Sequence, residues 1–156
     1  MSTDREASEN CVFCRIIAGE SPVSKVYEDD RALALMTIGP VTPGHAMVIP
    51  KKHVPYLDDL DEELGMHLFR ITQRVAKAIR HSGLRCEGIN LFLADGEVAF
   101  QEVFHFHLHV FPRYRGDPFR IDADWSNQPP REELDRTAAM IRDAYERLFL
   151  APTAES

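Results

Sequence analysis

The sequence is poor in cysteine and has neither a long apolar run nor an apolar leader segment, and each of these features excludes a class of protein. Only three cysteines occur among 156 residues, an odd number that does not suit a disulfide framework. No run of about 18 apolar residues occurs, so no transmembrane helix is expected. The opening residues, MSTDREASEN, are polar and lack the apolar core of a signal peptide. We therefore expect a cytoplasmic protein with reduced thiols.

The chain also lacks an excess of positive charge. Lys and Arg number 18 against 25 Asp and Glu, which gives a formal net charge of −7. Nucleic-acid and anionic-membrane binders carry net basic surfaces, so neither partner is expected. A small anionic ligand responds only to its local site and is not excluded. The length suits one domain with a substantial core.

Hydrophobic patterning predicts an α+β fold. Residues 1–10 resemble a disordered tail. Asn10 is a candidate cap for a short helix over 11–18. Strands are expected at 24–29, 32–38, 45–53 and 88–94, with an amphipathic helix over 61–82 and a last helix from about residue 130. The long helix is predicted to bury Leu64, Leu68, Ile71, Val75 and Ile79. Because only one connection holds a full crossover helix, the strands should be mainly antiparallel, with that helix packed on one face.

The stretch HFHLHVFPR places His105, His107 and His109 at alternate positions. A period of two is that of a β-strand, so the three imidazoles should share one face, and Pro112 should end the strand. One alternative is a half-exposed strand that is merely rich in histidine. The others are a three-histidine metal site or a nucleophile with its supporting histidines.

The segment CVFC places Cys11 and Cys14 at C-x-x-C spacing. The pair suits buried packing, a redox couple, or half of a zinc site that needs two further ligands. His53 and one histidine of the triplet are candidates for those ligands. Cys86 stands apart and is interpreted as structural.

Three stretches together resemble the histidine-triad (HIT) family, in its zinc-containing bacterial-type branch. They are CVFCRIIAGESP, VYEDDRALALMTIGPVTPGHAMVIPKKH and FQEVFHFHLHVFPR, which occur in the family's order. The resemblance implies a HIT domain over 11–115. Residues 116–156 would be a C-terminal extension with a helix, part of the same domain.

The resemblance implies a homodimer that binds a purine nucleotide and cleaves or transfers it at the α-phosphate through a covalent nucleotidyl-histidine. His107 would be the nucleophile, oriented by the backbone carbonyl of His105. His109 would donate to the phosphate, protonated if it is to offset developing charge. His45 would support the triad, although such a residue is also compatible with an ordinary core histidine.

The resemblance further implies a nucleotide site and a structural zinc site. The zinc ligands would be Cys11, Cys14, His53 and His105. The nucleotide-binding positions would be Val12, Phe13, Ile16, Leu35, Thr37, Ile38, Phe100, Gln101 and Glu102.

Four positions depart from the family pattern. Thr37 stands where Asp usually holds the ribose, Ala94 replaces an amide, Phe100 replaces Gly and Glu102 replaces Ser or Thr. A carboxylate beside a phosphate would repel it. Three functions are therefore kept: a nucleotide hydrolase or transferase, a nucleotide-binding module with little turnover, and a hydrolase whose three histidines hold a catalytic metal.

Overall fold

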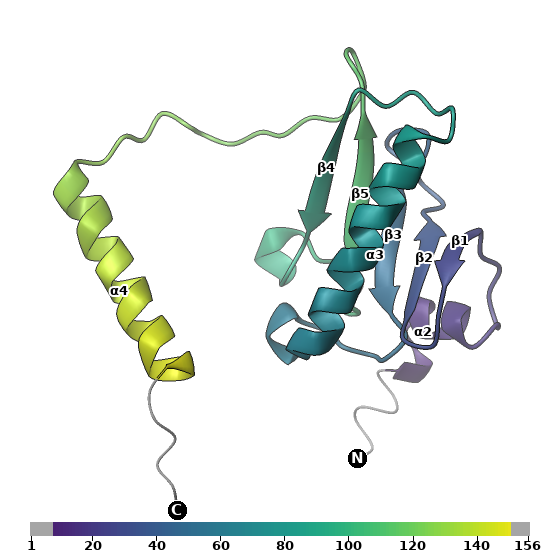
Figure 1. Ribbon diagram of the computed structural model, residues 1–156, viewed down its shortest axis with the longest axis horizontal. Coiled ribbons are helices and arrows are strands. Elements are labelled where there is room, and N and C mark those ends of the chain that lie inside the picture. The colour runs from purple at the N-terminus through teal and green to yellow at the C-terminus, as the bar shows by residue number, and fades with distance from the viewer. Residues whose placement is uncertain (1–7, 151–156) are drawn as a thin grey trace, which may run out of the picture. The chain divides into compact units, whose positions relative to one another are not determined.

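The computed structural model describes residues 8–150, which divide into two compact units, one ending at Phe119 and the other beginning at Arg120. The first unit contains a sheet with helices α2 and α3 (Figure 1). Its elements are α2 (Val12–Ile17), β1 (Lys25–Glu28), β2 (Ala32–Met36), β3 (Ala46–Pro50), η1 (Leu57–Asp59), α3 (Glu62–Arg80), β4 (Gly88–Leu93), η2 (Glu97–Ala99) and β5 (Leu108–Arg113).

The five strands form one sheet in the order β1-β2-β3-β5-β4, and every neighbouring pair is antiparallel. The predicted α+β class and antiparallel sheet are confirmed. The helix α3 connects β3 to β4 and crosses one face of the sheet in Figure 1. The last strand, β5, enters between them and pairs with both.

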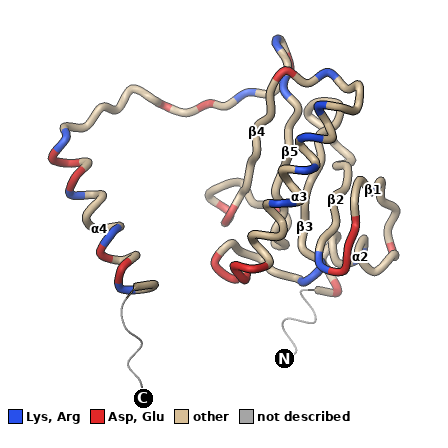
Figure 2. Tube along the Cα trace, viewed as in Figure 1, with Lys and Arg blue, Asp and Glu red and all other residues tan. Residues whose placement is uncertain are grey.

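The long helix forms where its apolar period predicts. Asp61 caps it by accepting a hydrogen bond from the backbone N–H of Leu64 at 3.2 Å. Acidic residues occupy its first turn and basic residues its last, as Figure 2 shows, which suits the helix dipole. All five residues of its predicted apolar face are buried.

Successive side chains along β2 and β3 point to opposite faces of the sheet, and both faces are buried. Small residues such as Ala32, Ala34 and Ala46 face α3 and let it approach closely. Leu33, Leu35, Met47 and Ile49 belong to a second cluster with Cys11 and Phe13, on the opposite face. The candidate site lies on this second face.

The predicted strand through all three histidines is wrong in its first half. β5 begins at Leu108, so His109 lies in the strand while His105 and His107 precede it. The backbone there bonds elsewhere: the N–H of Phe106 donates to the carbonyl of Val54 at 2.6 Å. This diversion away from the β3 ladder moves His105 toward the N-terminal helix.

The prediction that Pro112 ends the strand is also wrong. Pro112 lies inside β5 and pairs in register with Ile89 of β4. The carbonyl of Pro112 points away from β4 and accepts a 2.7 Å hydrogen bond from the Thr42 hydroxyl. An N–H at residue 112 would point to that same side of the strand. The pairing of β5 with β3 ends at Val110, so the lack of an N–H at Pro112 costs no hydrogen bond between strands.

The predicted short N-terminal helix is present, but Asn10 does not cap it. Cys11 occupies the N-cap position and makes no side-chain cap bond. The prediction of a disordered tail over 1–10 lies mostly outside the described residues.

The second unit contains α4 (Arg131–Phe149), which confirms the predicted last helix. Pro130 precedes it as the N-cap residue, and the rings of Tyr145 and Phe149 lie 5.1 Å apart along it. That residues 116–156 belong to the same domain as 11–115 stays a prediction.

Candidate functional site

The side chain of His107 is held by the backbone two residues before it. Its Nδ1 lies 2.7 Å from the carbonyl oxygen of His105. A carbonyl only accepts, so Nδ1 carries the proton and donates. The other ring nitrogen, Nε2, keeps its lone pair as a potential nucleophile.

His107 and His109 line a hollow of about 410 Å³ on the α2 face of the sheet. The hollow gathers ten of the residues predicted for the site. They are Val12, Phe13, Ile16, Leu35, Thr37, Ile38, Phe100, Glu102, His107 and His109. Sequence reasoning missed Met36, Met47 and Val103 as lining residues. For Met47 a signal existed, because it lies two positions after His45 on a strand and therefore on the same face.

His45 is buried and links the backbone of Val41 to His109, which lines the hollow, through two hydrogen bonds. Its Nδ1 accepts from the backbone N–H of Val41 at 3.2 Å, and its Nε2 lies 2.8 Å from Nδ1 of His109. A backbone N–H only donates, so His45 in its neutral form carries its proton on Nε2 and donates it to His109. His109 then carries its own proton on Nε2.

The surroundings keep these imidazoles neutral near pH 7. Burial lowers the pKa of His45 to about 4. Burial, with smaller effects of His107 and His45, also lowers the pKa of His109 to about 4. For His107, burial lowers the pKa, although the bond to the His105 carbonyl and the charge of Glu102 act the other way. A neutral His107 is the form that can attack phosphorus, whereas a protonated His109 is not expected.

Gln101 does not line this hollow. Its side chain is buried and accepts from the N–H of Gly96 at 2.7 Å, while its Nε2 donates to the carbonyls of Pro55 and Val103 at 2.7 and 3.2 Å. All of these partners are backbone groups. The structure therefore gives Gln101 a role in fixing the loop before the triad.

Three of the residues that depart from the family pattern differ in exposure: Phe100 and Glu102 are exposed and line the hollow, whereas Ala94 is buried and does not line it. Phe100 adopts a left-handed backbone with φ of 70° and leaves its ring 80% exposed. Its N–H donates to the carbonyl of Glu97 at 3.0 Å and so is not free for a phosphate. Ala94 is buried, and the neighbouring Asp95 accepts from the N–H of Leu57 at 2.8 Å. Glu102 is exposed and faces the hollow.

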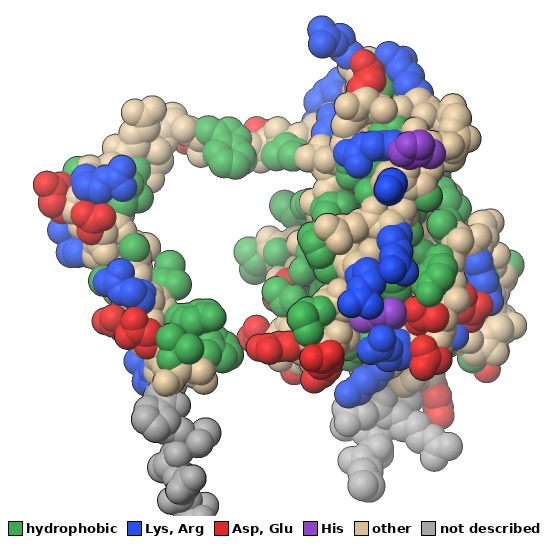
Figure 3. Space-filling model, in the orientation of Figure 1, with side chains coloured by type: hydrophobic (Ala, Val, Ile, Leu, Met, Phe, Trp, Pro, Cys, Tyr) green, Lys and Arg blue, Asp and Glu red, His purple; other side chains and the backbone are tan. Residues whose placement is uncertain are grey.

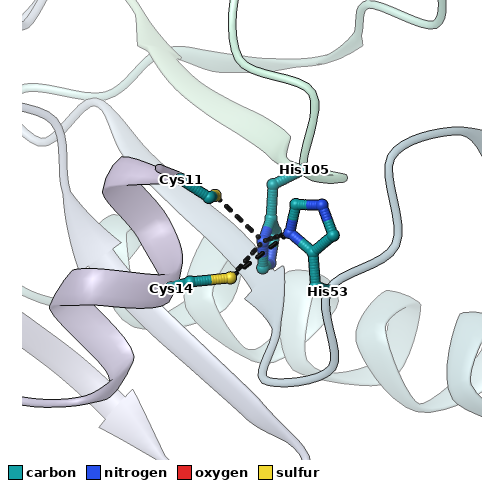
Figure 4. A group of neighbouring side chains, drawn as sticks. All are labelled: Cys11, Cys14, His53 and His105. Atoms are coloured by element: carbon teal, nitrogen blue, oxygen red, sulfur yellow. Dashed lines mark hydrogen bonds between the residues drawn. The ribbon is translucent and has the colours of Figure 1, made fainter. Parts of the chain in front are cut away.

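A second group joins the N-terminal helix to the loop before β5. Cys11, Cys14, His53 and His105 place one ligand atom each within 4.8 Å of one another (Figure 4). Nδ1 of His105 lies 3.5 Å from each sulfur and 3.3 Å from Nδ1 of His53, which is itself 3.3 Å from Sγ of Cys14. The four predicted ligands are therefore brought together.

These four separations fit a tetrahedral metal ion. With Zn–N of about 2.0 Å and Zn–S of about 2.3 Å, tetrahedral zinc places two nitrogens about 3.3 Å apart, and nitrogen and sulfur about 3.5 Å apart. Nε2 of His105 lies 2.8 Å from the carbonyl of Pro50 and must donate to it, which leaves the Nδ1 lone pair aimed into the group. Burial lowers the pKa of His105 to about 4, which keeps that lone pair available.

The three triad histidines do not converge on one metal. His105 turns Nδ1 toward the cysteines, His107 turns Nδ1 toward a backbone carbonyl, and His109 turns Nδ1 toward His45. In the described part of the chain, the candidate metal group contains only one of the three.

The chain is similar to several known proteins. The model of the HIT domain family matches residues 18–116. The protein hit of Bacillus subtilis is 45% identical over 113 residues, covering 72% of this chain and 77% of that protein. The adenylylsulfatase HINT3 of Arabidopsis thaliana is 33% identical over 136 residues, covering 85% of this chain and 66% of that protein.

Among solved structures, the chain is similar to a zinc-bound histidine triad family protein from Mycobacterium smegmatis. The two share a TM-score of 0.68 and 41% identity over 88% of this chain and 99% of the other. The matched domain model spans well over half of the sequence and contains the triad, His45 and His53. The chain therefore belongs to the HIT domain family.

Proposed function

We propose that the chain cleaves a nucleotide at its α-phosphate, as a hydrolase or nucleotidyl transferase, through a covalent bond to His107. The substrate would be a nucleoside phosphoramidate or a dinucleoside polyphosphate. The observation that carries the proposal is the 2.7 Å bond from Nδ1 of His107 to the His105 carbonyl, beside a hollow that admits a ligand. It leaves Nε2 unprotonated and its ring fixed, which an attacking imidazole requires.

The hollow suits a nucleoside. Phe13 and Leu35 are buried and present apolar surface, while Val12 and Ile38 are exposed at the rim. A flat base binds well between apolar side chains, and about 410 Å³ is in the range of small-ligand sites. We propose a purine nucleotide as the ligand.

The reaction would proceed in two balanced steps. The Nε2 lone pair of His107 attacks phosphorus, and the bond from phosphorus to the leaving group breaks. The leaving group takes a proton from solvent. Water then attacks the same phosphorus and gives up a proton to solvent, while the bond from phosphorus to Nε2 of His107 breaks. This step releases the nucleoside monophosphate and restores neutral His107 with its proton on Nδ1. Throughout, the N–H at Nε2 of His109 would donate to a phosphate oxygen.

The kinship with HINT3 supports hydrolytic activity on a nucleotide, since that relative is an adenylylsulfatase. The third function, in which the triad holds a catalytic metal, is not favoured, because only His105 belongs to the candidate metal group.

We also propose that Cys11, Cys14, His53 and His105 hold a structural zinc ion. All four positions of a tetrahedral ion would be filled by protein, so the zinc would offer no open position for chemistry. When bound it would supply a cross-link between α2 and the loop before β5, with its charge balanced by two thiolates. It would also fix His105, whose carbonyl orients His107.

A homodimer is proposed through β4. The two edges of the sheet differ: β1 is four residues long and carries Lys25 and Glu28, whereas β4 is six residues long and exposes Leu91 and Phe92. Charged, short edges resist pairing, and a longer apolar edge invites it. A second copy would extend the sheet there.

A nucleotide-binding module with little turnover is the second candidate. It is favoured by the internal bonds of Gln101 and of the Phe100 N–H, which remove two potential phosphate donors.

None of the helices in the described residues has the length and hydropathy that a membrane span requires. The cytoplasmic location and the absence of nucleic-acid and membrane partners stay predictions.

Trapping the intermediate tests the proposal. Wild-type protein mixed with an adenosine phosphoramidate and quenched within one turnover should carry an adenylyl group, located by peptide mass spectrometry at His107. His107→Asn should carry none. Tight nucleotide binding with neither adduct nor turnover would favour the binding module instead.

A further inference from the structure

A second hollow adjoins the nucleotide site. It has a volume of about 450 Å³ and shares Val12, Glu102 and Val103 with the first. Its wall includes the exposed rings of Tyr56 and Phe104, whose centroids lie 5.8 Å apart. If the nucleoside occupies the first hollow, the other substituent on phosphorus can extend past Glu102 into the second.

The two hollows differ from an ordinary polyphosphate site in charge. Among the described residues that line them, none is Lys or Arg, and Glu102 is the one carboxylate. Cys11 and His53 also line the second hollow, and in the proposed zinc site two thiolates would balance the charge of the ion. No hydrogen bond or ion pair joins the Glu102 carboxylate to another described residue. Several Lys and Arg side chains lie over α3 in Figure 3, and that helix packs on the other face of the sheet.

We infer that the second hollow is a leaving-group subsite and that Glu102 makes it selective for an amine that carries a positive charge. This rests on the proposed function and narrows its substrate class to phosphoramidates. An ammonium group on the leaving amine would pair with Glu102, and its hydrocarbon part would lie against Tyr56 and Phe104, whose ring faces also attract cations. A polyphosphate leaving group would instead bring negative charge against a carboxylate.

The chemistry of the step is unchanged by this selectivity. The bond between phosphorus and the leaving nitrogen breaks as His107 attacks, and that nitrogen takes a proton from solvent. The second, charged group of the leaving amine does not react. Glu102 is therefore a specificity-determining residue, and its effect should depend on the charge of the leaving group.

The test compares three adenosine 5′-phosphoramidates of similar length. Their leaving amines are 1,4-diaminobutane, which keeps a cationic end, pentylamine, which is neutral, and 4-aminobutyrate, which is anionic. Wild-type kcat/KM should fall in that order, by about threefold to tenfold at each step, as expected for one partly exposed ion pair gained or opposed. Added salt should reduce the differences.

Glu102→Gln keeps the shape of the side chain and removes its charge. It should bring the three substrates to within about twofold of one another, by slowing the cationic substrate and accelerating the anionic one. Glu97→Gln is the matched control, since Glu97 lies in the preceding 3-10 helix, is exposed and lines neither hollow. It removes the same charge from the same region and should keep the wild-type order.

Different outcomes would contradict the leaving-group subsite and the proposed function. Turnover of all three substrates at equal rates, or a preferred dinucleoside polyphosphate with magnesium, would overturn the subsite and leave the nucleophile intact. Absence of any adduct at His107 with any of the substrates would overturn the proposed function itself.

Discussion

Nε2 of His45 lies 2.8 Å from Nδ1 of His109, and the proton between them belongs to His45. The assignment follows from Val41, whose backbone N–H occupies the other nitrogen of His45. His109 is thereby set with its remaining N–H on Nε2 while both rings stay neutral. The pair gives the site a directed hydrogen-bond donor without a buried positive charge.

Removing His45 should release His109 from this tautomer. For His45→Ala we expect kcat to fall by about tenfold, less than the 10²–10³ lost with a direct charge-stabilising donor. The ¹⁵N shifts of His109 should change from a single tautomer to a mixture. A loss of activity with unchanged His109 shifts would mean that His45 acts only through packing. His81→Ala, at an exposed histidine on the end of α3, is the control.

The triad residues should fail in three different ways. His107→Asn should abolish turnover by several orders of magnitude and leave zinc content and nucleotide binding intact. His109→Ala should lower the rate by roughly 10²–10³. His105→Ala should cost zinc and stability first. Loss of metal from all three variants together would show a metal site in place of a nucleophile.

Protein purified without chelator should contain about one zinc per chain. Cys11→Ser with Cys14→Ser should lose it and lower the melting temperature, because the ion would join residues more than 90 positions apart. Cys86→Ser is the matched control, since Cys86 lies outside the group and its thiol donates to the Gly88 carbonyl. Zinc retained in the double variant would rule the site out.

Stability should fall as pH drops from about 6.5 to 4. The folded pKa of His45 and of His109 is about 4, below the ordinary 6.5, so the unfolded chain binds more protons in this window. Their contribution is fully present above pH 6.5 and is lost as pH approaches 4. Urea unfolding at several pH values measures it, with a chelating dye to follow zinc release separately. A His45→Asn, His109→Asn variant should have a shallower dependence, and an unchanged slope would refute the assignment.

Gln101→Ala should destabilise the protein by about 1–3 kcal/mol, because it leaves buried backbone groups without partners. Gln73→Ala, at an exposed position of α3, should change stability by less than about 0.5 kcal/mol. Chemical denaturation of both variants checks this. Nucleotide affinity lost in Gln101→Ala without loss of stability would restore the ligand-binding role predicted from the sequence.

Local patterns in the sequence were enough to predict most of the helices and strands and the residue types of the site. The 4-3-4-4 spacing in 61–82 specified a helix and its buried face, because apolar side chains must fall on one side of a 3.6-residue period. The antiparallel sheet and the approximate positions of β1, β2, β3 and β4 were confirmed for the same kind of local reason, whereas the strand predicted through all three histidines was not. The resemblance then supplied the candidate ligands and nucleophile.

The different positions and partners of the three histidines follow from long-range contacts in the folded chain and not from their spacing. A period of two placed them on one strand, yet Val54 and Pro50 draw residues 105–107 out of the ladder. Cys11 and His105 meet across 94 positions, a contact that no local pattern encodes. Tautomers depend on which partner each nitrogen meets, and those partners are backbone groups placed by the fold. The sequence specifies which residues are histidines, whereas the ring nitrogen that carries the proton depends on the groups that surround each ring in the folded protein.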